Sequence, residues 1–289
     1  MTMRSKFINV LFSLQLILNS SEISANAFEN KSIRLSGKDK SITRIVSLTS
    51  LTSDIIYHLS PESLKGRPDS SLFLKIKKFN TIPIVSKGRT PPNLELIISL
   101  KPDLVIGAKG FHDKSLKTLN EIGIKTLSTQ LKDWSDLESL INELKLVTNS
   151  KKNNLNEKLI NCVNETGAKG DEVVVLVSTK PLLAPNSQSW AGSLLSRFNI
   201  KNLTSKLESS SRLKGYVNLS PEWLIDKNPD KLILIDFNND DLSKFYKLPF
   251  WKDLNAVKNN NISNFNYYGL INAGSLETIN NACKQLKSI

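Results

Sequence analysis

The chain has 289 residues, and its 39 Lys and Arg outnumber 27 Asp and Glu to give a formal charge of +12. The lysines are spread along the chain and form no basic arm, so the charge does not predict binding to nucleic acid. Two cysteines and two histidines are too few for a metal centre built from these ligands, and neither a metal site nor a bound cofactor is expected.

The first 27 residues have the pattern of a secretory signal peptide. Arg4 and Lys6 precede an apolar run, Phe7–Leu18, and a polar stretch then ends in Ala25-Asn26-Ala27. A basic start, a short apolar core and small residues at the cleavage site define such a leader. The run is shorter than the roughly 20 residues that cross a bilayer. We therefore expect residues 1–27 to be removed by cleavage after Ala27, leaving a periplasmic protein.

Beyond Ser41, short apolar strands alternate with helices. Arg44–Leu48 is predicted to be a strand, and Ser53-Asp54 is predicted to cap a helix that ends at Leu59. The other clear elements are strand Asp103–Gly107, helix Ser115–Ile122, a strand starting with Ile124–Leu127, and strands Glu172–Ser178 and Asp230–Asp236. Such alternation predicts an α/β fold whose mainly parallel sheets are covered by helices.

One unit of the sequence occurs twice. Asn93–Ile106 (NLELIISLKPDLVI) resembles Ser220–Ile233 (SPEWLIDKNPDKLI). In each, a helix-capping residue stands two positions before a glutamate, Glu95 or Glu222, and Pro-Asp follows seven positions after it. The cap begins a two-turn helix, the proline ends it, and an apolar strand follows. The repeat predicts two lobes of similar design, each with its own sheet.

The region between the two lobes is predicted to be helical. We assign residues 41–132 to an N-terminal lobe, 133–168 to a linker helix and 171–289 to a C-terminal lobe. Apolar residues at helical spacing predict one long helix or two abutting helices in the linker, with a kink or frayed turn at Asn149–Asn154. For Cys162 and Cys283 the sequence leaves two alternatives open, a disulfide or two small apolar residues on packed helices.

These segments resemble one family. RIVSLTSLTSDIIYHL, NLELIISLKPDLVIG, the linker and LSPEWLIDKNPDKLILI are similar to class III periplasmic substrate-binding proteins, the receptors for ferric siderophores, haem and vitamin B12. The resemblance extends from about Thr43 to the end of the chain. It implies two Rossmann-like lobes bridged by a long linker helix, no catalysed reaction, and a monomer that works with an ABC permease dimer and its ATPase.

The resemblance also implies a role for the two glutamates. In the family, one glutamate on each lobe pairs with arginines of the permease, and Glu95 and Glu222 fall on the matching positions. The alternative for both is a favourable interaction of a carboxylate with the helix dipole. The chain departs from the family after the first helix, where Leu59–Arg67 keeps only Gly66 of a glycine-rich segment, and this puts one wall of the ligand site in doubt.

Ligand-binding residues are expected where strand ends of the two lobes face each other. The candidates are Thr49, Ser50, Arg89, Lys109 and His112 in the first lobe, and Trp190, Tyr216, Phe237 and Tyr267-Tyr268 in the second. Each has a structural alternative. Trp190 and Phe237 are candidate core residues, the paired tyrosines candidate strand residues, Arg89 and Lys109 solvated charges, and His112 a surface loop residue.

The expected ligand is a small organometallic compound. Tyr216 lies six residues before Glu222, where the vitamin B12 receptor of the family carries a tryptophan, but that receptor's other tryptophans have no counterpart here. Arg89 and Lys109 suit the carboxylate, catecholate or hydroxamate groups of a ferric chelate. We rank a ferric siderophore first, a corrinoid second and haem third. An exported enzyme is disfavoured because Gly-x-Ser-x-Gly and P-loop motifs are absent, and a binding module linked to a sensor stays open.

Overall fold

The computed structural model describes residues 42–289, except 75, 89, 153–154, 163–169, 212 and 238–241. The predicted signal peptide, residues 1–27, and the candidate ligand residue Arg89 therefore lie outside the described residues. Among the described helices, none combines the length and the apolar character that a membrane span requires.

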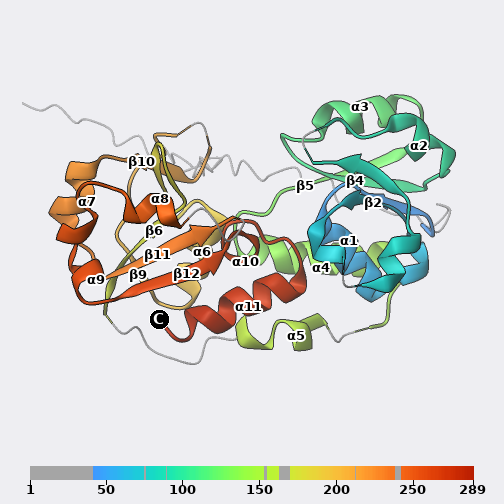
Figure 1. Ribbon diagram of the computed structural model, residues 1–289. Coiled ribbons are helices and arrows are strands. Elements are labelled where there is room, and N and C mark those ends of the chain that lie inside the picture. Colours follow the sequence, from blue (N-terminus) through green and yellow to red (C-terminus); the bar gives the residue numbers. More distant parts are fainter. Residues whose placement is uncertain are drawn as a thin grey trace, which may run out of the picture. The chain divides into compact units, whose positions relative to one another are not determined.

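The first half of the described chain forms one parallel sheet (Figure 1). Its strand order is β3-β2-β1-β4-β5. The strands are β1 (Ile45–Ser47), β2 (Leu64–Asp69), β3 (Ile84–Lys87), β4 (Leu104–Ala108) and β5 (Lys125–Thr129). They are connected by helices α1 (Ser50–Leu59), α2 (Leu94–Ser99) and α3 (Asp113–Glu121) and by the 3-10 turns η1 (Pro61–Ser63), η2 (Ser71–Phe73) and η3 (Lys77–Thr81). The predicted α/β alternation is confirmed.

The second half contains a parallel sheet of order β12-β11-β6-β9 and a small antiparallel sheet of order β10-β8-β7. The parallel strands are β6 (Glu172–Leu176), β9 (Lys201–Asn202), β11 (Lys231–Asp236) and β12 (Ile262–Asn266), and the antiparallel strands are β7 (Ser178–Thr179), β8 (Leu182–Pro185) and β10 (Tyr216–Leu219). The helical elements are α6 (Trp190–Arg197), α7 (Pro221–Lys227), α8 (Ser243–Tyr246), η5 (Trp251–Asp253), α9 (Asn255–Lys258), α10 (Tyr267–Leu270) and α11 (Leu276–Leu286). The predicted strand Glu172–Ser178 ends at Leu176, because the chain reverses at Lys180-Pro181 and pairs Ser178 with Leu183.

The repeated sequence unit is a repeated structural unit. The side chain of Asn93 accepts a hydrogen bond from the backbone of Leu96 at 2.9 Å, and Ser220 accepts one from Trp223 at 3.1 Å, so both predicted caps are confirmed. Each helix then ends before a residue with positive φ, Lys101 (φ 48°) in one unit and Asn228 (φ 42°) in the other.

The aspartate of each Pro-Asp pair has the same function in the two sheets. Asp103 accepts a hydrogen bond from the backbone of Arg44, just before β1, at 3.0 Å, and Asp230 accepts one from Glu172, the first residue of β6, at 2.9 Å. Asp103 directly precedes β4, which pairs in parallel with β1. Asp230 directly precedes β11, which pairs in parallel with β6. The unit therefore sets the start of its own strand and of the neighbouring strand.

The predicted linker is divided. Helix α4 covers Trp134–Val147, Asn149 takes a positive φ of 49°, and two short segments follow, α5 (Leu155–Lys158) and η4 (Ile160–Cys162). Of the two predicted alternatives, separate helices are the one found in the described residues, and the break falls at the polar stretch. The carbonyl of Leu59 holds this break by accepting a hydrogen bond from the Ser150 hydroxyl at 2.9 Å.

Two further points were decided by the structure. Cys162 and Cys283 form a disulfide that joins η4 to α11, with their Cα atoms 5.0 Å apart. Helix α1 begins at Ser50 with Thr49 as its cap, so the predicted cap at Ser53-Asp54 is wrong. Thr49 takes the cap because the chain is still extended there, two residues after β1, and its side chain accepts from the backbone of Thr52; Asp54 is left inside the helix, where its side chain is buried.

Candidate functional site

Three of the predicted polar residues of the first half, Thr49, Ser50 and Lys109, follow the carboxyl ends of strands in the first sheet. Thr49 and Ser50 follow β1, and Ser86 and Lys87 close β3. Lys109 follows β4, and its backbone N–H donates to Thr129 at the end of β5 over 2.8 Å. Because all five strands are parallel, these ends lie along one edge of the sheet. Lys87 and Lys109 are exposed there, and both can present an ammonium group to an anionic ligand.

Thr49 is already engaged in the fold. Its hydroxyl accepts a hydrogen bond from the backbone of Thr52 at 3.3 Å and lies 2.6 Å from the Thr52 hydroxyl. Its carbonyl accepts from the hydroxyls of Ser47 and Ser53 at 2.9 and 2.8 Å. The half-buried Thr49 and Ser50 thus sit at a hydroxyl-rich turn between β1 and α1, where only part of each side chain reaches solvent.

His112 is buried, which corrects its expected surface position. It is 5% exposed, and its Nδ1 accepts a hydrogen bond from the backbone of Ala108 at 2.9 Å. Burial lowers the pKa of the imidazole below its ordinary value, so the ring is neutral near pH 7. His112 closes the turn between β4 and α3, and there it packs directly against Gly107. The packing is so close that a Cβ on Gly107 would lie only 2.8 Å from the His112 Cβ.

Aromatic residues meet at the carboxyl ends of β11 and β12. Phe237 follows β11 and Tyr267 follows β12, and their rings stack with centroids 4.7 Å apart. The ring of Tyr268 stands edge-on to Tyr267 at 5.3 Å. Parallel pairing of Asp236 with Asn266 explains this meeting, because the next residue of each strand emerges at the same level. Phe237 is 40% exposed, more than a core residue would be.

Tyr216 belongs to the same aromatic cluster. Burial raises the pKa of its hydroxyl, and the neighbouring Tyr267 raises it further. Burial and Tyr267 also raise the pKa of Tyr268. The hydroxyls of Tyr216 and Tyr268 therefore stay protonated and can donate hydrogen bonds, while the rings offer stacking surface. We call Tyr216, Phe237, Tyr267 and Tyr268 the aromatic cluster.

Trp190 supports this cluster from the interior. Its side chain is 5% exposed, and its Nε1 donates to the carbonyl of Gly269 at 2.8 Å, two residues after Tyr267. Its ring also stacks on Trp134 at the start of α4, with centroids 6.2 Å apart. The Arg197 guanidinium lies 4.1 Å from the centroid of the Trp134 ring. Trp134 and Arg197 were not among the predicted ligand residues, although a tryptophan at the start of the linker was a visible signal.

Glu95 and Glu222 are both exposed in the first turns of α2 and α7. The backbone N–H of Glu222 and the Ser220 hydroxyl hold the pKa of the Glu222 carboxyl below its ordinary value, so this side chain is ionised near pH 7. Both carboxylates are therefore accessible charges at equivalent positions of the repeat.

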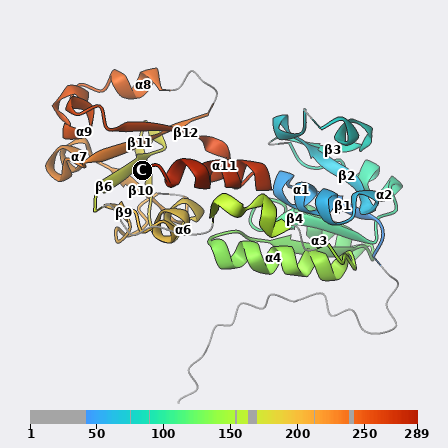
Figure 2. The same ribbon diagram turned by 90° about the horizontal axis from the view of Figure 1, so that it is seen from below.

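A buried carboxylate that was not among the predicted site residues joins α1 to α11. Asp54 accepts a hydrogen bond from the backbone of Leu276, the first residue of α11, at 2.8 Å. His58 lies one helical turn away, with its Nε2 at 3.5 Å from the carboxylate. Burial raises the pKa of Asp54 to about 6 and lowers that of His58 to about 4. Figure 2 shows α11 reaching α1 at this point.

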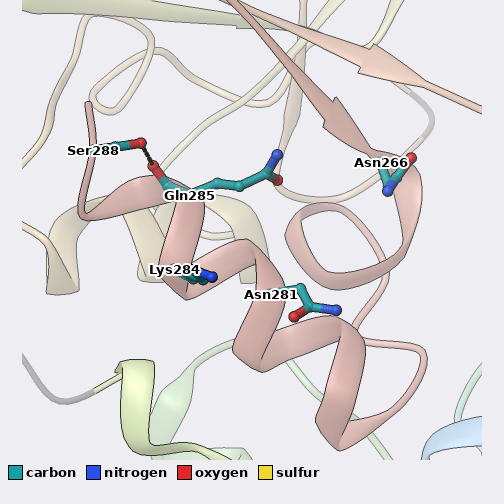
Figure 3. A pocket seen from close by; sticks show the side chains of 5 residues that line it. All are labelled: Asn266, Asn281, Lys284, Gln285 and Ser288. Carbon is teal, nitrogen blue, oxygen red and sulfur yellow. Dashed lines mark hydrogen bonds between the residues drawn. The ribbon is translucent and has the colours of Figure 1, made fainter.

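A polar hollow of about 430 Å³ lies on α11 at the end of β12. Figure 3 shows its lining side chains, Asn266, Asn281, Lys284, Gln285 and Ser288. None of these is a predicted ligand residue, and all are exposed. Within the parts of the chain that the structure describes, no group of three His, Cys, Asp or Glu side chains is placed to hold a metal ion.

Comparison with known proteins identifies the family. The model of the periplasmic binding protein family matches residues 45–265. The chain belongs to this family. Its members are binding proteins and not enzymes.

A curated relative is the putative ABC transporter substrate-binding lipoprotein YhfQ of Bacillus subtilis, 26% identical over 197 residues, which are 60% of this chain and 59% of the relative. The match thus spans less than two thirds of that protein's length.

Solved structures share the fold at low identity. The haem-binding protein HutB of Vibrio cholerae has a TM-score of 0.69 at 18% identity, covering 85% of this chain and 98% of its own. A possible iron-binding periplasmic protein of Staphylococcus epidermidis has a TM-score of 0.64 at 23% identity, covering 86% and 98%. The vitamin B12-binding protein BtuF of Vibrio cholerae has a TM-score of 0.60 at 17% identity, covering 86% and 96%. The predicted two-lobed α/β fold is thereby confirmed.

Proposed function

We propose that this protein is the extracytoplasmic receptor of an ABC importer and that it delivers an iron chelate of the ferric siderophore type to an ABC permease dimer with its ATPase. The observation that carries the proposal is the arrangement of strand ends in both halves of a periplasmic binding protein. Exposed lysines lie at the ends of parallel strands in one half, and Phe237 and Tyr267 of the aromatic cluster follow parallel strands in the other. A ferric chelate has groups that suit both halves. Its anionic oxygens can pair with the lysines, and its flat ligand groups can stack on the aromatic rings.

The choice of an iron chelate over its alternatives rests on charge. Lys87 and Lys109 are exposed at the edge of the first sheet, and Arg89 lies two positions after Lys87 in the sequence. A guanidinium can bind a carboxylate or catecholate with two hydrogen bonds. A corrinoid is the alternative ligand because its flat ring would stack on Phe237 and Tyr267, and haem would use both the rings and the cations.

The deciding experiment compares ligands on one protein. Calorimetry of the mature chain with ferric citrate, a catecholate and a hydroxamate siderophore, cobalamin and haem should show tightest binding of one of the iron chelates. Replacing Arg89 with alanine should weaken this binding by about 1.5–3 kcal/mol, the worth of a hydrogen bond to a charged group. The matched control is Lys117→Ala, an exposed cation on α3 that should leave affinity unchanged. Tight cobalamin binding that is insensitive to Arg89, with no chelate bound, would make the corrinoid the ligand.

Transfer to the permease is assigned to Glu95 and Glu222. Both are exposed and occupy equivalent positions of the repeat, so each can meet one subunit of a permease dimer. Glu95→Gln/Glu222→Gln should keep ligand affinity and reduce uptake at limiting receptor, because complementary charges govern the rate and orientation of docking. Normal uptake by the double variant would remove the docking assignment.

A further inference from the structure

The two repeated helices share a second exposed residue. Ile98 lies three positions after Glu95 on α2, and Ile225 lies three positions after Glu222 on α7. Each isoleucine is 44% exposed. Residues three apart in a helix are neighbours on one face, so each glutamate has an apolar side chain beside it.

The two isoleucines are exposed although the helices that carry them, α2 and α7, are well packed. The residue just before each isoleucine, Ile97 or Leu224, is fully buried at 0% exposure and packs in the core of its own half. Both helices are also fixed at their starts by side-chain caps. Single exposed apolar residues are common on protein surfaces. Here, however, an isoleucine with the same exposure stands at the same position of both repeated units, and the core residues of both units are fully packed.

We infer that Ile98 with Glu95, and Ile225 with Glu222, form two equivalent contact patches for a partner that presents two equal sites, each with a basic group beside apolar surface. The inference rests on the proposed function and extends it, because the occupant is the permease dimer and the new contacts are the isoleucines. Charge supports this occupant: the patches are acidic on a chain of formal charge +12, so they select a basic partner surface. The repeat supports its symmetry, since two equal patches fit two copies of one subunit.

The two residue types of each patch should act on different rates. The glutamates attract the partner over distance and so govern association. The isoleucines lose water only at contact and so slow dissociation. Covering about half of an isoleucine side chain corresponds to roughly a fivefold change in affinity at each patch.

The test measures both rates on the whole receptor. Mature wild type, Ile98→Ser/Ile225→Ser and Glu95→Gln/Glu222→Gln are bound to the permease–ATPase complex of the same organism in nanodiscs, and ligand affinity and thermal midpoints are recorded for each. We expect the isoleucine variant to dissociate roughly 20-fold faster with an unchanged association rate, and the glutamine variant to associate more slowly. The matched control is Ile122→Ser, an isoleucine that is 55% exposed and lies outside both units.

The outcomes distinguish failure of the isoleucine contacts from failure of docking through the glutamates. If the glutamine variant is impaired and the isoleucine variant dissociates like wild type, the apolar contacts are refuted and the docking assignment stands. If neither variant differs from wild type, the docking assignment itself is wrong. If Ile122→Ser has the same effect as the double isoleucine variant, the effect is general to exposed isoleucines and the two patches are refuted.

Discussion

Asp54 and His58 lie four residues apart on α1, and burial shifts the pKa of each away from its ordinary value. The pKa of Asp54 rises to about 6 and that of His58 falls to about 4, so both side chains are neutral near pH 5. Lys158 and Glu277 also act on Asp54, and Lys158 and Lys152 act on His58. Because Asp54 binds the first backbone N–H of α11, its protonation state bears on the contact between α1 and α11.

The two shifts have opposite signs in the pH dependence of stability. The folded pKa of Asp54 lies above its unfolded value of 3.8, so its contribution to stability falls as the pH rises from about 4 to 6. The folded pKa of His58 lies below 6.5, so its contribution is lost as the pH falls from 6.5 to about 4. Between about pH 4 and 6 the two slopes oppose each other in the wild type.

Single substitutions should therefore reveal one slope each. Relative to wild type, we expect the free energy of unfolding of Asp54→Asn to rise with pH across pH 4–6.5, and that of His58→Gln to fall, each by up to about 1.4 kcal/mol per pH unit. Urea unfolding at half-unit pH steps measures both. Profiles of the two variants that run parallel to each other would show that these residues do not carry the opposed shifts.

Gly192 makes a second prediction for a single residue. A Cβ at this position of α6 would lie 2.0 Å from the carbonyl oxygen of Asn186, and backbone cannot give way as a side-chain end can. We expect Gly192→Ala to lower the free energy of unfolding by about 3 kcal/mol, the upper end for overpacking. Ser196→Ala on the exposed side of the same helix is the control and should change it by less than about 0.5 kcal/mol. Equal stability of the two variants in urea would mean that α6 shifts freely away from Asn186.

At the scale of elements, the two repeated units should tolerate exchange of their caps. Asn93 and Ser220 accept the same hydrogen bond at the start of α2 and α7. We expect Asn93→Ala and Ser220→Ala each to cost about 1 kcal/mol, whereas the exchange Asn93→Ser/Ser220→Asn should be nearly neutral, because both residue types cap well. Thermal unfolding with the four proteins side by side measures this. An exchange that costs as much as the alanines would show that the surroundings, and not the cap, set the preference.

What the sequence could predict at this scale was local. The caps and proline stops of the two repeated units and the buried strands depend on neighbours within a few residues, and the structure confirms them. The cap predicted at Ser53-Asp54 was wrong although it too was a local inference. Phe237 and Tyr267, each the first residue after its strand, lie side by side because parallel pairing of β11 and β12 brings their ends to one edge. His112 and Trp190 were harder: their burial depends on contacts with Gly107 and Gly269, which no periodicity marks. The bond from Leu276 to Asp54 spans 222 residues and had no local signal beyond a charged pair on an apolar helix.

At the scale of the whole molecule, α11 gathers long-range connections. Its start is held by Asp54 of α1, and its middle is joined to η4 by the disulfide between Cys162 and Cys283. Beside the disulfide, the backbone of Asn161 donates to the Asn280 side chain at 3.0 Å, and Arg197 of α6 donates to the carbonyl of Cys162 at 2.8 Å. The last helix therefore ties together segments from the beginning, the middle and the end of the described chain.

The disulfide should account for much of this protein's stability, because the two cysteines are 121 residues apart in sequence and closing so long a loop removes much entropy from the unfolded chain. We expect Cys162→Ala/Cys283→Ala to lower the free energy of unfolding by about 4 kcal/mol. Ligand affinity should hold, since both cysteines are fully buried and neither belongs to the aromatic cluster. Urea unfolding of the variant and of wild type, with and without reductant, measures the loss: reduction should bring wild type to the level of the variant and leave the variant unchanged. Wild type that unfolds at the same urea concentration with and without reductant, while thiol titration proves the bond broken, would show that packing around Cys162 and Cys283 stabilises the fold without the covalent link.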